Sequence, residues 1–144
     1  GGKIRAHVPY FAFSGATMIA LGAQTIHMGE GAVLGPVDPQ LGGFAAADLM
    51  QLKNVKRPEN MDDLTHLLAM RAAKAYAETR ALVATLVSTQ EALDRLTSGL
   101  TSHGHPITFA EASALQLPVE QGVPENFYKI LNGRLKKPKL TLRL

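Results

Sequence analysis

Residues 8–26 most constrain how the chain can fold, because they contain no Asp, Glu, Lys or Arg. A stretch of this length barely reaches across a bilayer, and it is interrupted by proline, glycine and polar residues. A strand, a turn and a buried helix account for it better than a membrane span. We therefore predict a strand over residues 5–11 and a helix that is buried nearly all round over residues 16–23, with Ser14 and Gly15 at the turn.

The rest of the chain alternates between short apolar runs and helical patterns. This order favours an α/β layered fold. The strands are too few for a complete doubly wound sheet, so we expect missing partners, either N-terminal sequence or another subunit. The further predicted elements are strands at 25–28 and 32–35, a helix at 45–52, a long helix at 62–98 with a break near Ser88, and short helices that begin near Thr108 and Pro124. Asn60 or Asp62 is predicted to cap the long helix, and Thr108 with Glu111 matches a capping box. The core face of the long helix is predicted to be Leu64, Leu68, Ala72, Ala75, Thr79, Leu82 and Leu86.

Composition and charge narrow the class of protein. The 144 residues include no cysteine, which excludes disulfides and thiolate zinc sites. Residues 134–144 carry five cations and no acid, so they account for more than the whole formal net charge of +3. We expect a solvated basic tail, with an anionic partner or a membrane surface as the alternative. No aromatic residues are interleaved with these cations, so nucleic-acid binding is not expected.

Ser14 is the candidate nucleophile. A serine followed by Gly15, between an apolar strand and an apolar helix, can project its hydroxyl from the turn while the glycine permits close backbone approach. Backbone amides at a helix start point outward with the positive end of the helix dipole, so the Gly15 amide could stabilise an oxyanion. The same local pattern also suits a serine that only caps the helix.

A second motif follows in the segment FSGATMIALGAQTIHMGEGAVLGPVDPQLG, residues 13–42. The pair resembles the signature of the serine dehydrogenase proteinase family, which is related to signal peptide peptidase A and the Clp proteolytic subunit. The likeness continues through residues 62–78 and 102–119 and covers about residues 4–128. In that family the serine of the S-G-G/A segment attacks the substrate, and G-P-V-D-P-Q lines the region near it. The family more often has glycine where Ala16 stands.

The resemblance implies a Clp/crotonase-like layered fold and a serine peptidase that acts on peptides or proteins through an acyl-enzyme on Ser14. It also implies a homo-oligomer and no metal or organic cofactor. Residues 1–133 would be the C-terminal part of the peptidase domain, and residues 134–144 the basic tail. The family's first half, with its first strands and a glycine-rich turn that supplies the other oxyanion amide, is absent. We therefore expect this piece alone to be inactive and to come from a longer cytoplasmic or membrane-associated protein, which could be anchored through its N-terminal portion.

The general base does not follow from the resemblance, because relatives use either Ser-Lys or Ser-His-Asp. A lysine base needs burial or nearby positive charge to lower its pKa. Lys74 fits the need for burial best, since Leu67 and Met70 lie on the same face of the long helix. Glu78, one turn later, could instead form an ion pair with Lys74 and keep it charged. Lys53 is the alternative, with cationic but polar neighbours.

The histidines offer other roles. His27 and His66 are predicted to be packed or surface residues. His103 and His105 lie in one loop, and either could approach the active site across a subunit boundary. Asp38 is the best acid if a histidine is the base, although a turn-capping role suits it too. A metal site at the His-x-His pair would need a third ligand, to which the sequence does not point.

Two other classes of function remain open. The chain could be a non-catalytic scaffold or interaction module that keeps the fold. It could also be a crotonase-like acyl-CoA enzyme, in which the amides at the helix start polarise a thioester. That enzyme would give Ser14 no role, and the sequence offers no convincing pair of acid/base carboxylates for it.

Overall fold

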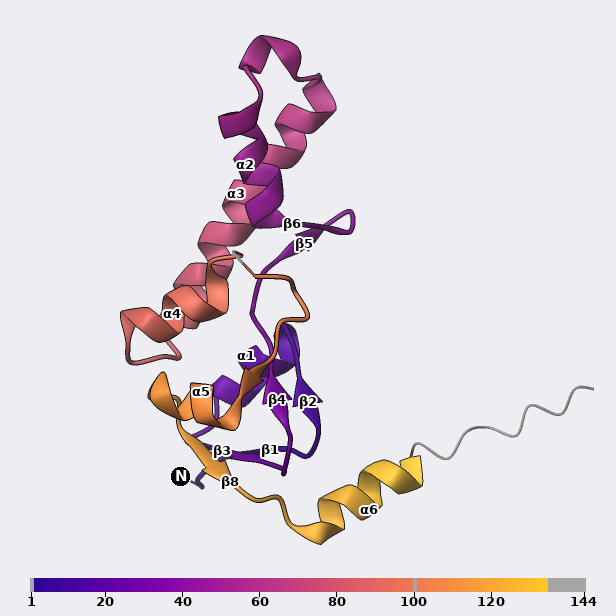
Figure 1. Ribbon diagram of the computed structural model, residues 1–144, viewed down its shortest axis with the longest axis vertical. Helices are drawn as coiled ribbons and strands as arrows, with labels where there is room; N and C mark the ends of the chain where they lie inside the picture. Colours follow the sequence, from indigo (N-terminus) through magenta and orange to yellow (C-terminus); the bar gives the residue numbers. More distant parts are fainter. Residues whose placement is uncertain (1, 100, 135–144) are drawn as a thin grey trace, which may run out of the picture.

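The computed structural model describes residues 2–99 and 101–134 and shows a mixed α/β fold (Figure 1). Within these ranges it contains six α-helices and several small sheets. The elements are, in order, β1 (Arg5–Val8), β2 (Phe11–Ala12), α1 (Gly15–Leu21), β3 (Thr25–Met28), β4 (Val33–Leu34), β5 (Gln40–Leu41), β6 (Phe44–Ala45), α2 (Ala46–Val55), the short 3-10 helix η1 (Pro58–Asn60), α3 (Asp63–Ala84), α4 (Gln90–Thr97), β7 (Ile107–Thr108), α5 (Phe109–Ala114), β8 (Val119–Gln121) and α6 (Glu125–Arg134).

The strands form two small three-stranded sheets and one hairpin. In the first sheet β3 lies between β1 and β8, and all three strands are parallel. In the second, β4 pairs in parallel with β2 and antiparallel with β7. The hairpin joins β5 to β6. The predicted strand over residues 5–11 is thus divided into β1 and β2, and the small size of the sheets agrees with the expectation that this sequence does not make a complete doubly wound sheet.

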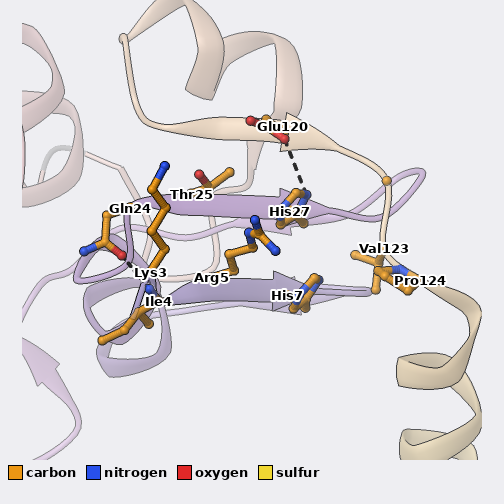
Figure 2. Close-up of a pocket in the computed structure, with 11 residues that line it drawn as sticks. Lys3, Ile4, Arg5, His7, Gln24, Thr25, His27, Glu120, Val123 and Pro124 are labelled. Carbon is orange, nitrogen blue, oxygen red and sulfur yellow. Dashed lines mark hydrogen bonds and ion pairs between the residues drawn. The ribbon is translucent and has the colours of Figure 1, made fainter. Parts of the chain in front are cut away.

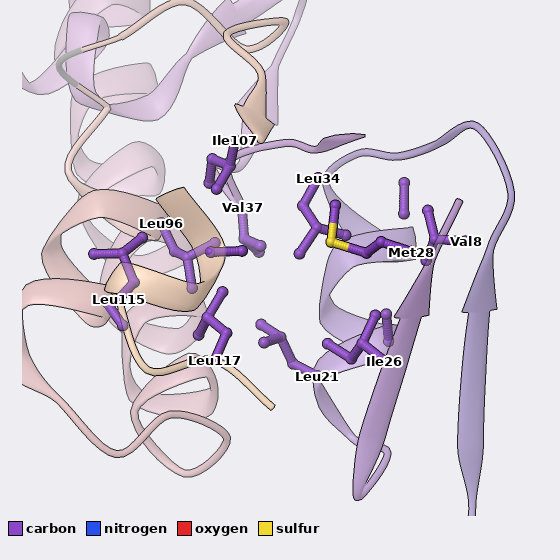
Figure 3. Packing of buried hydrophobic residues seen from close by; sticks show 14 of the residues in the cluster. Val8, Leu21, Ile26, Met28, Leu34, Val37, Leu96, Ile107, Leu115 and Leu117 are labelled. Atoms are coloured by element: carbon purple, nitrogen blue, oxygen red, sulfur yellow. The ribbon is translucent and has the colours of Figure 1, made fainter. Parts of the chain in front are cut away.

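The main core lies between the strands and the helices α1, α4 and α5 (Figure 3). Ile26, Met28, Leu34, Leu96 and Ile107 are fully buried there. Burying one such side chain contributes about 1.5–3 kcal/mol. The core therefore ties the first 37 residues, which carry the serine turn, to helices that follow much later in the chain.

Helices α2 and α3 pack against each other and extend away from the sheets as an arm (Figure 1). The predicted break near Ser88 is confirmed, because α3 ends at Ala84 and the Thr89 hydroxyl caps α4 by accepting from the Ala92 N–H. The predicted core face is wrong in part: Ala72 is buried, but Leu64 and Leu82 are 64% and 48% exposed. One side of α3 has no packing partner in the described chain, so these side chains face solvent.

The other predictions for local structure have mixed outcomes. Asp62 caps α3 and Thr108 caps α5, as predicted. Helix α1 forms as predicted but is not buried all round, since Ile19 is 80% exposed. No helix within the described ranges is long and apolar enough to cross a membrane. The predicted basic tail lies outside the described residues, apart from its first residue.

Candidate active site at the serine turn

Ser14 has an unusual backbone conformation at the turn between β2 and α1. Its φ and ψ are 54° and −120°, in a region that non-glycine residues rarely adopt and that costs about 1–3 kcal/mol. Its side chain makes no cap hydrogen bond to the first turn of α1. Ser14 therefore stands at the N-cap position without the side-chain hydrogen bond that a capping serine would make. Such a strained strand-to-helix turn exposes the hydroxyl of the nucleophilic serine in α/β-hydrolases.

Backbone hydrogen bonds hold this turn on both sides. The Ser14 N–H donates to the carbonyl oxygen of Pro36 at 3.1 Å, which links the turn to the loop after β4. The Ser14 carbonyl accepts from the Met18 N–H at 3.1 Å and so begins α1. The two motifs of the sequence, FSGAT and GPVDPQ, are therefore neighbours in space.

Thr17 makes a second link between these motifs, which sequence reasoning missed. It is fully buried, and its Oγ1 lies 2.7 Å from the carbonyl oxygen of Ala12 and 2.9 Å from that of Gly35. It also lies within 3.3 Å of the Gly35 N–H, from which it can accept. The one available signal was a hydroxyl residue in an otherwise apolar helix, since a buried hydroxyl is normally hydrogen-bonded.

Because Gly35 has no side chain, the ring of Phe13 can pack against its backbone. A Cβ added at Gly35 would lie 1.8 Å from Cδ1 of Phe13, far inside van der Waals contact. Phe13 immediately precedes Ser14, so the glycine allows the residue before the serine to pack against the second motif.

Gly15 leaves space in front of the turn. It is exposed, and a Cβ placed on it would meet no atom within 4 Å. As the first residue of α1, its N–H has no acceptor within the helix. The next amide, that of Ala16, donates to the carbonyl oxygen of Phe13 at 3.0 Å. An N–H at the start of a helix with open space before it can hold an anion.

An apolar groove of about 670 Å³ lies beside the turn. Ala12 and Ala16, which flank Ser14 in the sequence, contribute to it, and the exposed side chains of Phe11 and Ile19 line it as well. Helix α6 supplies Phe127, Ile130 and Leu131 on the other side. The groove is suited to apolar side chains.

Asp38 and His103 meet in a side-chain pair that the sequence did not predict as a contact. Asp38 is 3% exposed, and one carboxylate oxygen pairs with Nδ1 of His103 while the other accepts from Nε2 of Gln40 at 2.7 Å. The pair joins the loop after β4 to the loop before β7. His103 is partly exposed, so its ring reaches from a buried carboxylate towards solvent.

The sequence was compared with known protein families and with known proteins. The family model described as a ClpP-like SDH-type serine proteinase matches residues 1–140.

The chain belongs to this proteinase family.

Its relatives include two uncharacterized proteins of Methanocaldococcus jannaschii. MJ0137 is 40% identical over 136 residues, which cover 90% of this chain and 48% of the relative. MJ1495 is 33% identical over 131 residues, which cover 86% of this chain and 44% of the relative. The chain thus spans less than half the length of these two relatives. No solved structure matches it significantly.

The two candidate lysines of this proteinase-family chain lie on the arm, away from the turn. Lys53 is in α2 and Lys74 is in α3, and both are exposed. The burial that we expected for Lys74 is absent, because Leu67 and Met70 on the same face of α3 are themselves 46% and 52% exposed. Lys53 lines a cavity of about 440 Å³ between the two helices.

The remaining histidines are not gathered at the turn. His27 lies in β3 and stacks on His7 with 4.9 Å between ring centroids. His66 is partly buried on α3, and His105 is exposed in the loop before β7. Among the described residues, no group of three or more His, Cys, Asp or Glu side chains is arranged to hold a metal ion.

Proposed function

We propose that this chain forms part of a serine peptidase in which Ser14 attacks the carbonyl carbon of a peptide bond. The acyl-enzyme that results is then hydrolysed by water. One observation carries the proposal: Ser14 has a strained backbone at a strand-to-helix turn, while its side chain makes no cap hydrogen bond. Strain of this kind persists where the surrounding structure enforces it, and here Pro36 and Met18 hold the turn.

The Gly15 amide is the proposed donor to the oxyanion. Its position at the start of α1 and the open space before it support this role. A single preorganised donor of this kind contributes roughly 3–4 kcal/mol to transition-state stabilisation. We propose that a second donor, and the remaining layers of a Clp/crotonase-type fold, come from sequence outside this chain.

For the general base we propose either a lysine or His103. Lys74 and Lys53 are the lysine candidates, but both are exposed, so a partner would have to bury either of them to lower its pKa. His103 needs no such change, because Asp38 already holds its Nδ1 and leaves Nε2 for proton transfer. We therefore favour His103 as the base.

The path along the chain supports His103 further. Asp38 follows Pro36 by two residues, and Pro36 accepts from the Ser14 N–H. Two extended residues span at most about 7 Å, so the backbone of Asp38 lies within that distance of Pro36. In this mechanism His103 takes the proton from the Ser14 hydroxyl during attack and returns it to the leaving amine.

The groove and the arm suggest the partners. We propose that the apolar groove beside Ser14 takes an apolar side chain of an extended peptide substrate. We also propose that the protein is a homo-oligomer. Leu64, Leu67 and Met70 form an exposed apolar strip on α3, which a second copy of the chain could cover.

Labelling with a fluorophosphonate probe tests the proposal on the longest natural form of the protein that contains this sequence. Ser14→Ala should abolish labelling. Among His103→Ala, Lys74→Ala and Lys53→Ala, the variant that lacks the base should label much more slowly, and His105→Ala is the matched control. Circular dichroism would confirm that each variant is folded.

The outcomes separate the candidate functions. Labelling that survives Ser14→Ala would refute Ser14 as the nucleophile. A folded wild-type protein that does not label would favour the non-catalytic scaffold.

A further inference from the structure

The outer face of the β1–β3–β8 sheet carries a second cavity, whose lining does not include Ser14 (Figure 2). Side chains alternate between the two faces of a strand. Val8 and Ile26 therefore belong to the core face, where both are buried. Arg5, His7 and His27 belong to the other face and line a cavity of about 680 Å³.

Cationic and imidazole groups gather in this cavity from neighbouring strands. His7 pairs in register with His27, and Arg5 pairs with Thr25. Figure 2 shows the guanidinium of Arg5 directed along the sheet surface towards His27, with the Lys3 side chain extending towards Thr25. Lys3 and Arg5 thus bring two positive charges to one wall of the cavity.

One acid faces these groups from the far strand. Glu120 of β8 lies with a carboxylate oxygen 3.8 Å from Nδ1 of His27. It is mostly exposed. Among the residues that line the cavity, the two cations therefore outnumber the single carboxylate.

His7 supplies an independent sign of a missing partner. Its Nδ1 atom is buried and has no hydrogen-bond partner among the described residues. The ring is fixed between His27 and Phe127, whose centroids lie 4.9 and 4.0 Å away. A buried polar atom without a partner costs free energy, so a ligand or water that reaches it is favoured.

The protonation state of His7 also suits a donor role. Burial, followed by the nearby His27 and Arg5, holds the pKa of His7 below its usual value of 6.5. At neutral pH this ring is neutral and can donate from one nitrogen while it accepts at the other.

We propose that this cavity binds a small oxyanion, a phosphate or a carboxylate, through the fork of Arg5, the amine of Lys3 and the imidazole of His7. Guanidinium groups recognise both kinds of anion with paired hydrogen bonds, which are stronger than those between neutral groups. The imidazole of His27, the Thr25 hydroxyl and the Gln24 amide lie on the same lining and can complete the polar shell.

A titration of the chain with sodium phosphate at constant ionic strength tests this proposal. The probe is the NMR signals of the His7 and His27 rings. We expect saturable shifts with a dissociation constant of roughly 1 mM, weakened about tenfold or more by Arg5→Gln. Lys56→Gln removes a cation from an exposed position on the arm and should leave the affinity unchanged. Lys3→Gln, at an exposed site before β1, should weaken binding as well and keeps the test valid if Arg5→Gln does not fold.

A parallel titration with acetate separates the two anion sources. Saturable binding of either anion that Arg5→Gln weakens supports the site. The proposal is overturned if neither anion gives saturable shifts, or if Lys56→Gln weakens binding as much as Arg5→Gln. Because fluorophosphonate labelling of Ser14 does not enter this test, its outcome is independent of the proposed peptidase activity.

Discussion

The backbone N–H of Ser14 donates to the carbonyl oxygen of Pro36, so the serine turn and the loop after β4 form one structural unit. Thr17 and Gly35 add further contacts within the same unit. The position of the Ser14 hydroxyl therefore depends on two motifs that lie far apart in the sequence. Changes in either motif should affect the site, and each can be tested separately.

Ser14→Gly should abolish fluorophosphonate labelling and at the same time raise the free energy of unfolding by up to about 1 kcal/mol. Glycine adopts a positive φ without the steric cost that a side chain imposes, although part of the gain is lost because glycine is more flexible when unfolded. Gln116 is the matched control, since it is the other non-glycine residue with positive φ in the described part of the chain, at 59°. Gln116→Gly should stabilise similarly in urea denaturation but leave labelling intact. Destabilisation by Ser14→Gly would argue against strain at the turn.

Thr17→Val should lower the free energy of unfolding by about 1–3 kcal/mol and slow labelling of Ser14. The valine has nearly the same shape, but it leaves the groups around Ala12 and Gly35 without their hydroxyl partner. Thr79→Val, on a partly buried face of α3, should change stability much less. Chemical denaturation monitored by circular dichroism measures both variants. Equal effects of the two substitutions would mean that the Thr17 hydrogen bonds do not matter.

Gly35→Ala should destabilise the fold by about 1–3 kcal/mol, because its Cβ overlaps the Phe13 ring. A smaller side chain in Phe13→Leu should relieve part of that cost, and a double-mutant cycle measures the coupling. Gly104→Ala is the control, since a Cβ there meets nothing within 4 Å and should shift stability by less than about 0.5 kcal/mol. Additive effects of Gly35→Ala and Phe13→Leu would contradict the contact.

The stability of the fold should fall as the pH drops below 6.5, in part because of His7. Burial, then His27 and Arg5, hold the pKa of His7 below 6.5 in the folded state. Below that pH the unfolded chain binds a proton at His7 that the folded state resists, so the free energy of unfolding decreases until the pH passes the folded pKa. His7→Gln should flatten this dependence, whereas His105→Gln at an exposed position should not. Urea denaturation over a pH series would reject the idea if both variants keep the wild-type slope.

Local sequence patterns predicted the secondary structure well at particular points. The turn at Ser14 and the helix after it, the caps at Asp62 and Thr108, and the break near Ser88 agree with the structure. Each of these depends on residues within a few positions of one another. A cap, for example, is a bond between a side chain and an amide two or three residues later.

The same patterns failed where the answer depended on distant segments. Apolar spacing predicted burial for Leu64 and Ile19, but both are largely exposed. It likewise predicted an apolar setting for Lys74, which is exposed. Periodicity identifies which residues share a face of a helix, but it does not say whether another element covers that face.

The sequence by itself determined that a serine stands at a strand-to-helix turn in a chain of this proteinase family, since the local pattern and the two motifs carry that information. Only the tertiary structure decided that Ser14 is strained rather than capping, that Thr17 locks the turn, and that Asp38 holds His103. The physical reason is that these contacts join segments far apart along the chain. Their geometry is set by the packing of the core, which no short stretch of sequence specifies.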